Sequence, residues 1–180
     1  MAIRNTALWG TEGTSMGTED ENTGGTAKSN TLELTVRPLE QGDFFAWYEL
    51  FAGYAEFYNT PLVDERAMRA WAWLHGDKSA VRGLVAVDAS GAVLGLAHVQ
   101  EFERLLENDR GLLLEDLFVA PQHRGKGVAT AVINHLKDEA RDRGFGVIRW
   151  ITAEDNETAR RLYDSVAEKT DWVTYEFKLG

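Results

Sequence analysis

A glycine-rich turn between an apolar run and a periodic segment constrains the fold of this chain more than any other feature. The run Leu114–Val119 predicts a mostly buried strand, and helical periodicity begins near Gly127. Gly125 and Gly127 have no Cβ, so the backbone there can approach a ligand closely. The free N–H groups and the positive dipole end of the following helix would face that ligand. The pattern therefore predicts a phosphate-binding turn, to which Arg124 and Lys126 add positive charge.

A turn of this kind also occurs in α/β proteins in which it only reverses the chain, so this interpretation stays open beside the phosphate site. Two common phosphate binders are disfavoured. The turn lacks the Lys-Ser/Thr ending of a P-loop, and its spacing from the strand does not give the dinucleotide-binding fingerprint.

Residues further along the chain indicate one family. Arg124, Gly127 and Ala129 match the Arg-x-x-Gly-x-Gly/Ala signature of the GCN5-related N-acetyltransferase superfamily. The segments Val147–Thr152 and Asn156–Val166 predict the strand and helix that follow this signature. The chain resembles the superfamily over almost everything after its first 30 residues. Its Leu-Glu-Asp-Leu-Phe-Val strand most resembles the spermidine/spermine N-acetyltransferases and the related fungal histone and polyamine acetyltransferases.

The order of the predicted elements agrees with this resemblance. Strands are expected at Leu32–Val36, Val81–Val87, Val93–Val99, Leu112–Val119, Val147–Thr152 and Trp172–Lys178, and helices at Asp43–Phe57, Asp64–His75, Gly127–Gly144 and Asn156–Val166. The resulting β-αα-βββ-α-β-α-β succession predicts an α/β fold with a mixed sheet, the acyl-CoA N-acyltransferase fold that the resemblance implies.

The resemblance implies acetyl-CoA as co-substrate and no metal. The two strands before and after the turn would part into a V-shaped slot, with a bulge or splay in the first of them. The backbone of that first strand would bind the pantetheine arm as a neighbouring strand would, and the turn would hold the pyrophosphate. The implied cofactor-binding residues are Leu117, Phe118, Val119, Arg124, Gly125, Lys126, Gly127, Val128, Ala129, Thr130, Asn156 and Tyr163.

Acetyl transfer to an amine needs a base and benefits from an acid. An amine with a pKa of about 10 is mostly protonated at neutral pH and must lose a proton before it attacks a thioester. The resemblance places Glu115 at the base position, acting through water, and Tyr163 as the acid that protonates the leaving thiolate. Asp116 is expected on the opposite face of a regular strand, as a structural partner. A salt-bridged strand end and a packing aromatic are the alternative roles of Glu115 and Tyr163.

The acceptor site is expected against the two early helices. Tyr54, Glu56 and Glu115 are the candidate substrate-binding residues, because aromatic rings with carboxylates suit a cationic amine. Aromatic residues at helical spacing are also typical of a core. The histidines are dispersed without metal-ligand spacing and are expected to be surface or satisfied core residues; they are His75, His98, His123 and His135.

Charge and composition limit the partners. The net charge of −10 disfavours nucleic acid and anionic membrane surfaces, which require a basic face, and favours a cationic substrate. The absence of cysteine excludes disulfides, cysteine-ligated zinc and thiol nucleophiles. No apolar stretch of membrane-spanning length and no signal-peptide core is present, so a soluble, cytoplasmic protein is expected.

The chain divides into two parts. Residues 1–30 are acidic and polar without periodicity, which predicts a disordered tail, and residues 31–180 are expected to form one acetyltransferase domain. A homodimer is implied by the resemblance alone. The function expected is acetylation of a primary amine that is small or polycationic, with a protein lysine acetyltransferase as the nearest alternative. A non-catalytic acyl-CoA-binding module is a further alternative, although it would not need both Glu115 and Tyr163.

Overall fold

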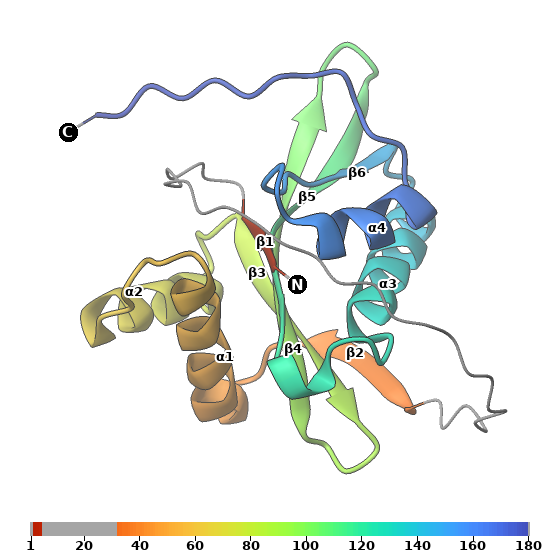
Figure 1. Cartoon of the computed structure of the whole chain (residues 1–180). Coiled ribbons are helices and arrows are strands. Elements are labelled where there is room, and N and C mark those ends of the chain that lie inside the picture. Colours follow the sequence, from red (N-terminus) through yellow and green to blue (C-terminus); the bar gives the residue numbers. More distant parts are fainter. Residues whose placement is uncertain (1, 5–31, 180) are drawn as a thin grey trace, which may run out of the picture.

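The computed structural model describes residues 2–4 and 32–179, and within them a six-stranded sheet separates two helical layers (Figure 1). The strands lie in the order β1-β5-β4-β3-β2, with β6 also paired to β5. The strands are β1 (Ala2–Arg4), β2 (Leu34–Pro38), β3 (Val81–Asp88), β4 (Val93–Arg104), β5 (Asp109–Val119) and β6 (Val147–Arg149). The helices are α1 (Phe44–Phe57) and α2 (Asp64–Leu74) on one face, and α3 (Val128–Asp142) and α4 (Glu157–Val166) on the other.

The two faces of the sheet have different cores. Aliphatic side chains dominate the α3 face, where Val128, Val132 and Leu136 recur at helical spacing and are buried against β5 leucines. The α1 face is aromatic, with Trp47 fully buried beside Trp71. The helical periodicity predicted from about Gly127 is thereby confirmed, and the predicted α/β fold with a mixed sheet is confirmed with it.

The neighbours of β5 change along its length, and this change positions the site. Near its start β5 pairs in parallel with β6, over Gly111–Leu113. Further along, the same edge pairs antiparallel with β1, over Asp116–Phe118. The other edge pairs with β4 throughout, except for a register shift at His98. The strands β5 and β6 therefore part after Leu113, as the predicted V-shaped slot requires.

The register shift is a bulge with one extra residue on β5. His98 pairs with Asp116, whereas the next residue on β4, Val99, pairs with Leu114. Glu115 is therefore the extra residue, and no residue of β4 lies directly opposite it in the register. A bulge of this kind breaks the alternation of side chains between the two faces of a sheet. The predicted irregularity in this strand thus falls at the carboxylate pair.

The predicted final strand, Trp172–Lys178, is wrong. Residues 167–179 form neither helix nor strand, and Tyr175, Phe177 and Leu179 are 89%, 88% and 85% exposed. Their apolar alternation is typical of a strand, but a strand forms only where its backbone joins a paired ladder, and the six described strands of the sheet do not include residues 172–178. The segment extends away from the domain (Figure 1).

The predicted tail contains one element that its composition did not indicate, the strand β1 at Ala2–Arg4. Residues 5–30, on which the prediction of disorder chiefly rests, lie outside the described residues. In the described part of the chain, no helix is both long and apolar enough to cross a membrane.

Candidate active site

The bulge turns both carboxylates of β5 toward the α1 face. The amide Nε2 of Gln100 donates to Glu115, and Asp116 is hydrogen-bonded to His98. Gln100 and His98 are two residues apart on β4, so their side chains share one face of the sheet. The prediction that Asp116 points away from Glu115 is therefore wrong. It assumed a regular strand, and the extra residue removes that regularity.

A chain of hydrogen bonds that begins at the buried Trp47 fixes the half-buried Asp116. The indole Nε1 of Trp47 donates to Nε2 of His98 over 3.0 Å, and Nδ1 of His98 lies 2.7 Å from Oδ2 of Asp116. An indole N–H is only a donor, so Nε2 accepts and the imidazole proton is assigned to Nδ1. The Tyr54 hydroxyl donates to the other oxygen of Asp116. Two donors thus hold this carboxylate, in keeping with a structural role, and His98 is a satisfied core histidine, 5% exposed.

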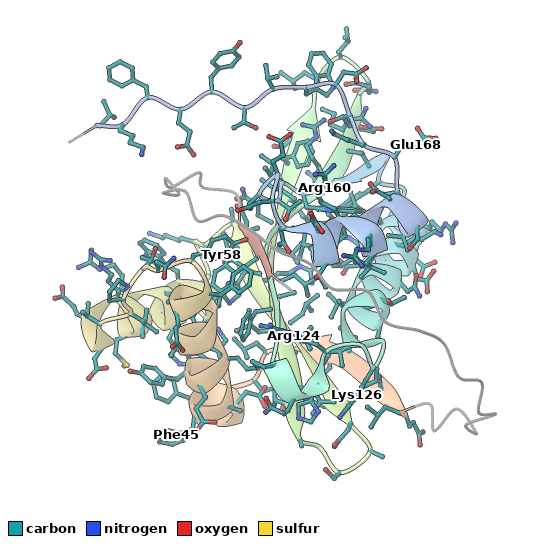
Figure 2. The ribbon with its side chains drawn as sticks, in the orientation of Figure 1. Phe45, Tyr58, Arg124, Lys126, Arg160 and Glu168 are labelled. Atoms are coloured by element: carbon teal, nitrogen blue, oxygen red, sulfur yellow. The ribbon has the colours of Figure 1, made fainter. Side chains whose placement is uncertain are left out.

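Tyr163 has a buried hydroxyl with no hydrogen-bond partner among the described residues. Its side chain projects from α4 and packs edge-on against Trp150, with ring centroids 5.4 Å apart. Burial raises the pKa of Tyr163 well above its usual value, and the nearby hydroxyl of Tyr58 raises it further. The hydroxyl therefore carries its proton at neutral pH, which a general acid requires. Tyr58 follows α1, in the layer on the other face of the sheet from α4 (Figure 2), and is still close enough to Tyr163 to raise its pKa.

The glycine turn has the shape and the open space that a phosphate site needs. Gly125 and Gly127 have φ angles of +72° and +84°, in the left-handed region, and a Cβ at either would meet no atom within 4 Å. The first bond into the α3 helix is donated by Ala131, to the Gly127 carbonyl. The N–H groups of the three residues before Ala131 therefore belong to the unpaired first turn. Lys126 lies exposed at the same turn (Figure 2).

Arg124 and Asn156 each have a structural partner. Arg124 donates from Nε to the Val119 carbonyl over 3.2 Å and lies over the Phe118 ring, which ties the turn to the end of β5. Asn156 caps α4 by accepting from the backbone N–H of Ala159, and its Nδ2 donates to Thr152 over 3.1 Å. Arg124 thus stabilises the segment that follows β5, and Asn156 stabilises the segment that connects β6 to α4.

Only some of the predicted substrate-binding residues lie near the carboxylate pair of β5. Tyr54 is buried on the inner face of α1 and contacts Asp116. Glu56 is exposed, and its position two residues later places it about 200° around the helix from Tyr54. The structure therefore brings Tyr54 to the carboxylate pair and does not bring Glu56 there.

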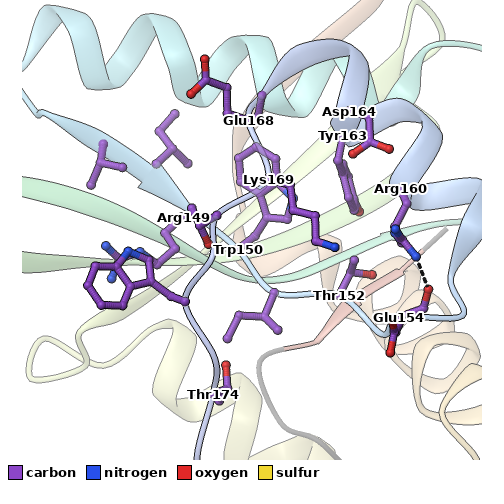
Figure 3. A pocket seen from close by; sticks show the side chains of 16 residues that line it. Arg149, Trp150, Thr152, Glu154, Arg160, Tyr163, Asp164, Glu168, Lys169 and Thr174 are labelled. Carbon is purple, nitrogen blue, oxygen red and sulfur yellow. Dashed lines mark hydrogen bonds between the residues drawn. The ribbon is translucent and has the colours of Figure 1, made fainter.

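A cavity of about 610 Å³ lies on the outer side of β6 (Figure 3). It is lined by β6 and the residues that follow it, by the inner face of α4 and by the segment 167–174, with Tyr163, Trp150 and Thr152 among the lining residues. It includes neither β5 nor the glycine turn, so it marks only the α4 side of the slot. The β5 side is covered by β1. Across residues 2–4 and 32–179, no group of three or more His, Asp or Glu side chains is placed to hold a metal ion.

Comparison with known proteins decides the family. Residues 44–167, more than half of the chain, match the Acetyltransferase (GNAT) family. The chain belongs to this family. A GNAT protein of this kind is an acyl-CoA-dependent N-acetyltransferase, and the resemblance stated from the sequence is confirmed at that level.

Two curated GNAT relatives match most of the chain. One is the D-amino-acid N-acetyltransferase HPA3 of Saccharomyces cerevisiae, 29% identical over 79% of this chain and 89% of the relative. The other is the thialysine N-epsilon-acetyltransferase of Mus musculus, 30% identical over 83% of this chain and 94% of the relative. The names of both describe acetylation of an amine.

Solved structures confirm the GNAT fold. A ribosomal-protein-alanine N-acetyltransferase from Brucella melitensis biovar Abortus 2308 superposes with a TM-score of 0.68, at 24% identity, over 82% of this chain and 99% of that chain. AAC(6')-Iy in complex with the bisubstrate analogue CoA-S-monomethyl-acetylneamine superposes with a TM-score of 0.65, at 17% identity, over 82% and 99%.

Proposed function

We propose that this protein transfers the acetyl group of acetyl-CoA to the primary amine of a small molecule. The observation that carries the proposal is the Tyr163 hydroxyl, which is buried, protonated and unpartnered among the described residues. A buried polar group without a partner costs folding free energy, and a catalytic role is one reason for which a protein retains such a group. The site for acetyl-CoA is the slot between β5 and β6, with the pyrophosphate on the first turn of α3.

The proposed reaction uses Glu115 as the base and Tyr163 as the acid. Glu115, through a water molecule, takes a proton from the ammonium group of the acceptor. The neutral nitrogen attacks the thioester carbonyl, forms the C–N bond and gives a tetrahedral adduct. The C–S bond then breaks, and the sulfur takes the proton of Tyr163. The nitrogen loses its second proton to water to give the neutral amide, and Glu115 returns the proton it accepted to solvent. Atoms and charge balance once Tyr163 regains a proton from solvent.

The acceptor is a small amine, and we favour a cationic one. The two curated relatives are named for D-amino acids and thialysine, both small amines. The excess of acidic residues, 29 against 19 basic, produces a field that attracts cations. A protein lysine side chain is the second candidate acceptor, because it also presents a primary amine that Glu115 could deprotonate.

Thiol release tests the proposal. Free CoA is measured with a thiol reagent while acetyl-CoA is offered with D- and L-amino acids, thialysine, polyamines, aminoglycosides and lysine peptides in turn. We expect release that depends on one class of small amine. Binding of acetyl-CoA without release for any amine would instead indicate a non-catalytic acyl-CoA-binding module.

We propose in addition that the protein is a cytoplasmic homodimer. The exposed apolar residues of the C-terminal segment, Trp172, Tyr175 and Phe177, support association, because each is more than four-fifths exposed. Light scattering behind a sizing column should then give about twice the chain mass of 20.1 kDa. A mass of one chain at micromolar concentration would reject the dimer.

A further inference from the structure

The strand β1 lies on the part of β5 that acetyl-CoA needs. Ala2 pairs with Phe118, Ile3 with Leu117 and Arg4 with Asp116, all antiparallel. The β6 strand has left this edge after Leu113. The edge over residues 116–118 is thus the one to which the family resemblance assigns the pantetheine arm of acetyl-CoA, and an N-terminal segment of the same chain covers it (Figure 1).

The strand β1 and the pantetheine arm cannot bind this edge at the same time, because both would use the same backbone N–H and C=O groups of β5. On its other edge β5 is already paired with β4, where Phe118 lies opposite Leu96 and Leu117 opposite Ala97. Each backbone N–H donates to one partner, and successive groups of a strand point to alternate edges. While β1 is in place, both edges of this stretch are therefore paired. The amide groups of pantetheine then have no edge to bind.

We propose that Ala2–Arg4 is a displaceable strand that competes with acetyl-CoA for the edge of β5. The inference rests on the proposed location of the cofactor. Displacement is feasible because β1 has only three residues and so makes only a few hydrogen bonds. The apparent dissociation constant of a cofactor rises in inverse proportion to the fraction of molecules whose site is free. Occupancy by β1 thus lowers the affinity for acetyl-CoA without changing the chemistry.

The test removes the hydrogen bonds of β1 in the full chain. Replacing Ala2→Pro and Ile3→Pro together deletes two consecutive N–H groups, one of which faces β5 whatever the register. The matched control, Ala2→Val with Ile3→Val, keeps both donors and suits a strand. Calorimetry with CoA then gives the dissociation constant of each form, and thiol release gives KM for acetyl-CoA and kcat.

We expect the proline variant to bind CoA several-fold to about 30-fold more tightly, with KM for acetyl-CoA lowered in parallel and kcat unchanged. The valine variant should match the parent. Hydrogen exchange should show the amides of residues 2–4 losing protection when CoA is added to the parent chain.

Three results would overturn the proposal. Equal CoA affinity in all forms would show that β1 and the cofactor do not compete, and would leave the acetyltransferase function intact. Weaker binding by the proline variant would show that the strand supports the cofactor. Absence of CoA binding in every form would overturn the proposed function and this proposal with it.

Discussion

Replacing Tyr163→Phe should make the protein more stable and less active. The change removes only the hydroxyl, which is buried without a hydrogen-bond partner among the described residues, and leaves the ring packed against Trp150. Because a catalytic hydroxyl is kept at the expense of folding free energy, the two effects have opposite signs. A tyrosine that served only as packing would not show this combination.

The expected magnitudes follow from burial. An unsatisfied buried polar group costs about 1–3 kcal/mol, part of which the phenylalanine recovers. A gain of about 1 kcal/mol corresponds to a rise in Tm of roughly 2–4 °C for a domain of this size. Loss of a general acid should lower kcat by about 10²-fold or more, with the affinity for acetyl-CoA nearly unchanged.

Thermal melts, thiol-release kinetics and calorimetry measure the three quantities. Tyr54→Phe is the matched control, because Tyr54 is also buried but its hydroxyl donates to Asp116. That variant should lose stability. If Tyr163→Phe melted below the parent, or turned over at the parental rate, the role assigned to this hydroxyl would be refuted.

The remaining predictions concern the cofactor turn, the base and the acceptor. Gly127→Val should abolish CoA binding in calorimetry. The control Gly91→Val should bind CoA normally, because Gly91 has a similar φ of +85° but lies in the β3–β4 turn, away from the cofactor turn. Equal CoA affinities of the two variants would place the phosphate site elsewhere. Glu115→Gln should lower the rate most near neutral pH and recover part of it as pH rises, because free amine then accumulates. A uniform loss across pH would argue against a base. For a polycationic acceptor, KM should rise clearly from low to high salt, since charge attraction is screened beyond about 8 Å at physiological ionic strength; a salt-independent KM would reject the cationic acceptor.

The glycine turn and α3 could be predicted because their signals are local. Left-handed φ angles at Gly125 and Gly127 need glycine, and the buried stripe of α3 follows from helical spacing. The shared face of Glu115 and Asp116 could not be predicted. The resemblance implied a bulge or splay in this strand but not its position, which depends on the pairing of β5 with β4.

The hydrogen-bond chain through His98 could also not be predicted from the sequence. Trp47, His98 and Asp116 are 51 and 18 residues apart, and only the packing of α1 on the sheet joins them. A buried histidine could be expected, but its partners could not. The strand predicted at residues 172–178 is wrong for a different reason. Apolar alternation leads to a strand only where the edge of a sheet is available to pair with it.

Transfer of an isotope-labelled acetyl group tests the central claim most directly. Acetyl-CoA labelled with carbon-13 in the acetyl group is incubated with the preferred amine of the panel, and the product is examined by mass spectrometry and NMR. We predict a labelled amide on the amine nitrogen, one CoA thiol for each amide, and a rate about 10²-fold lower with Tyr163→Phe. Binding of acetyl-CoA with no labelled amide from any amine at any pH would contradict the account.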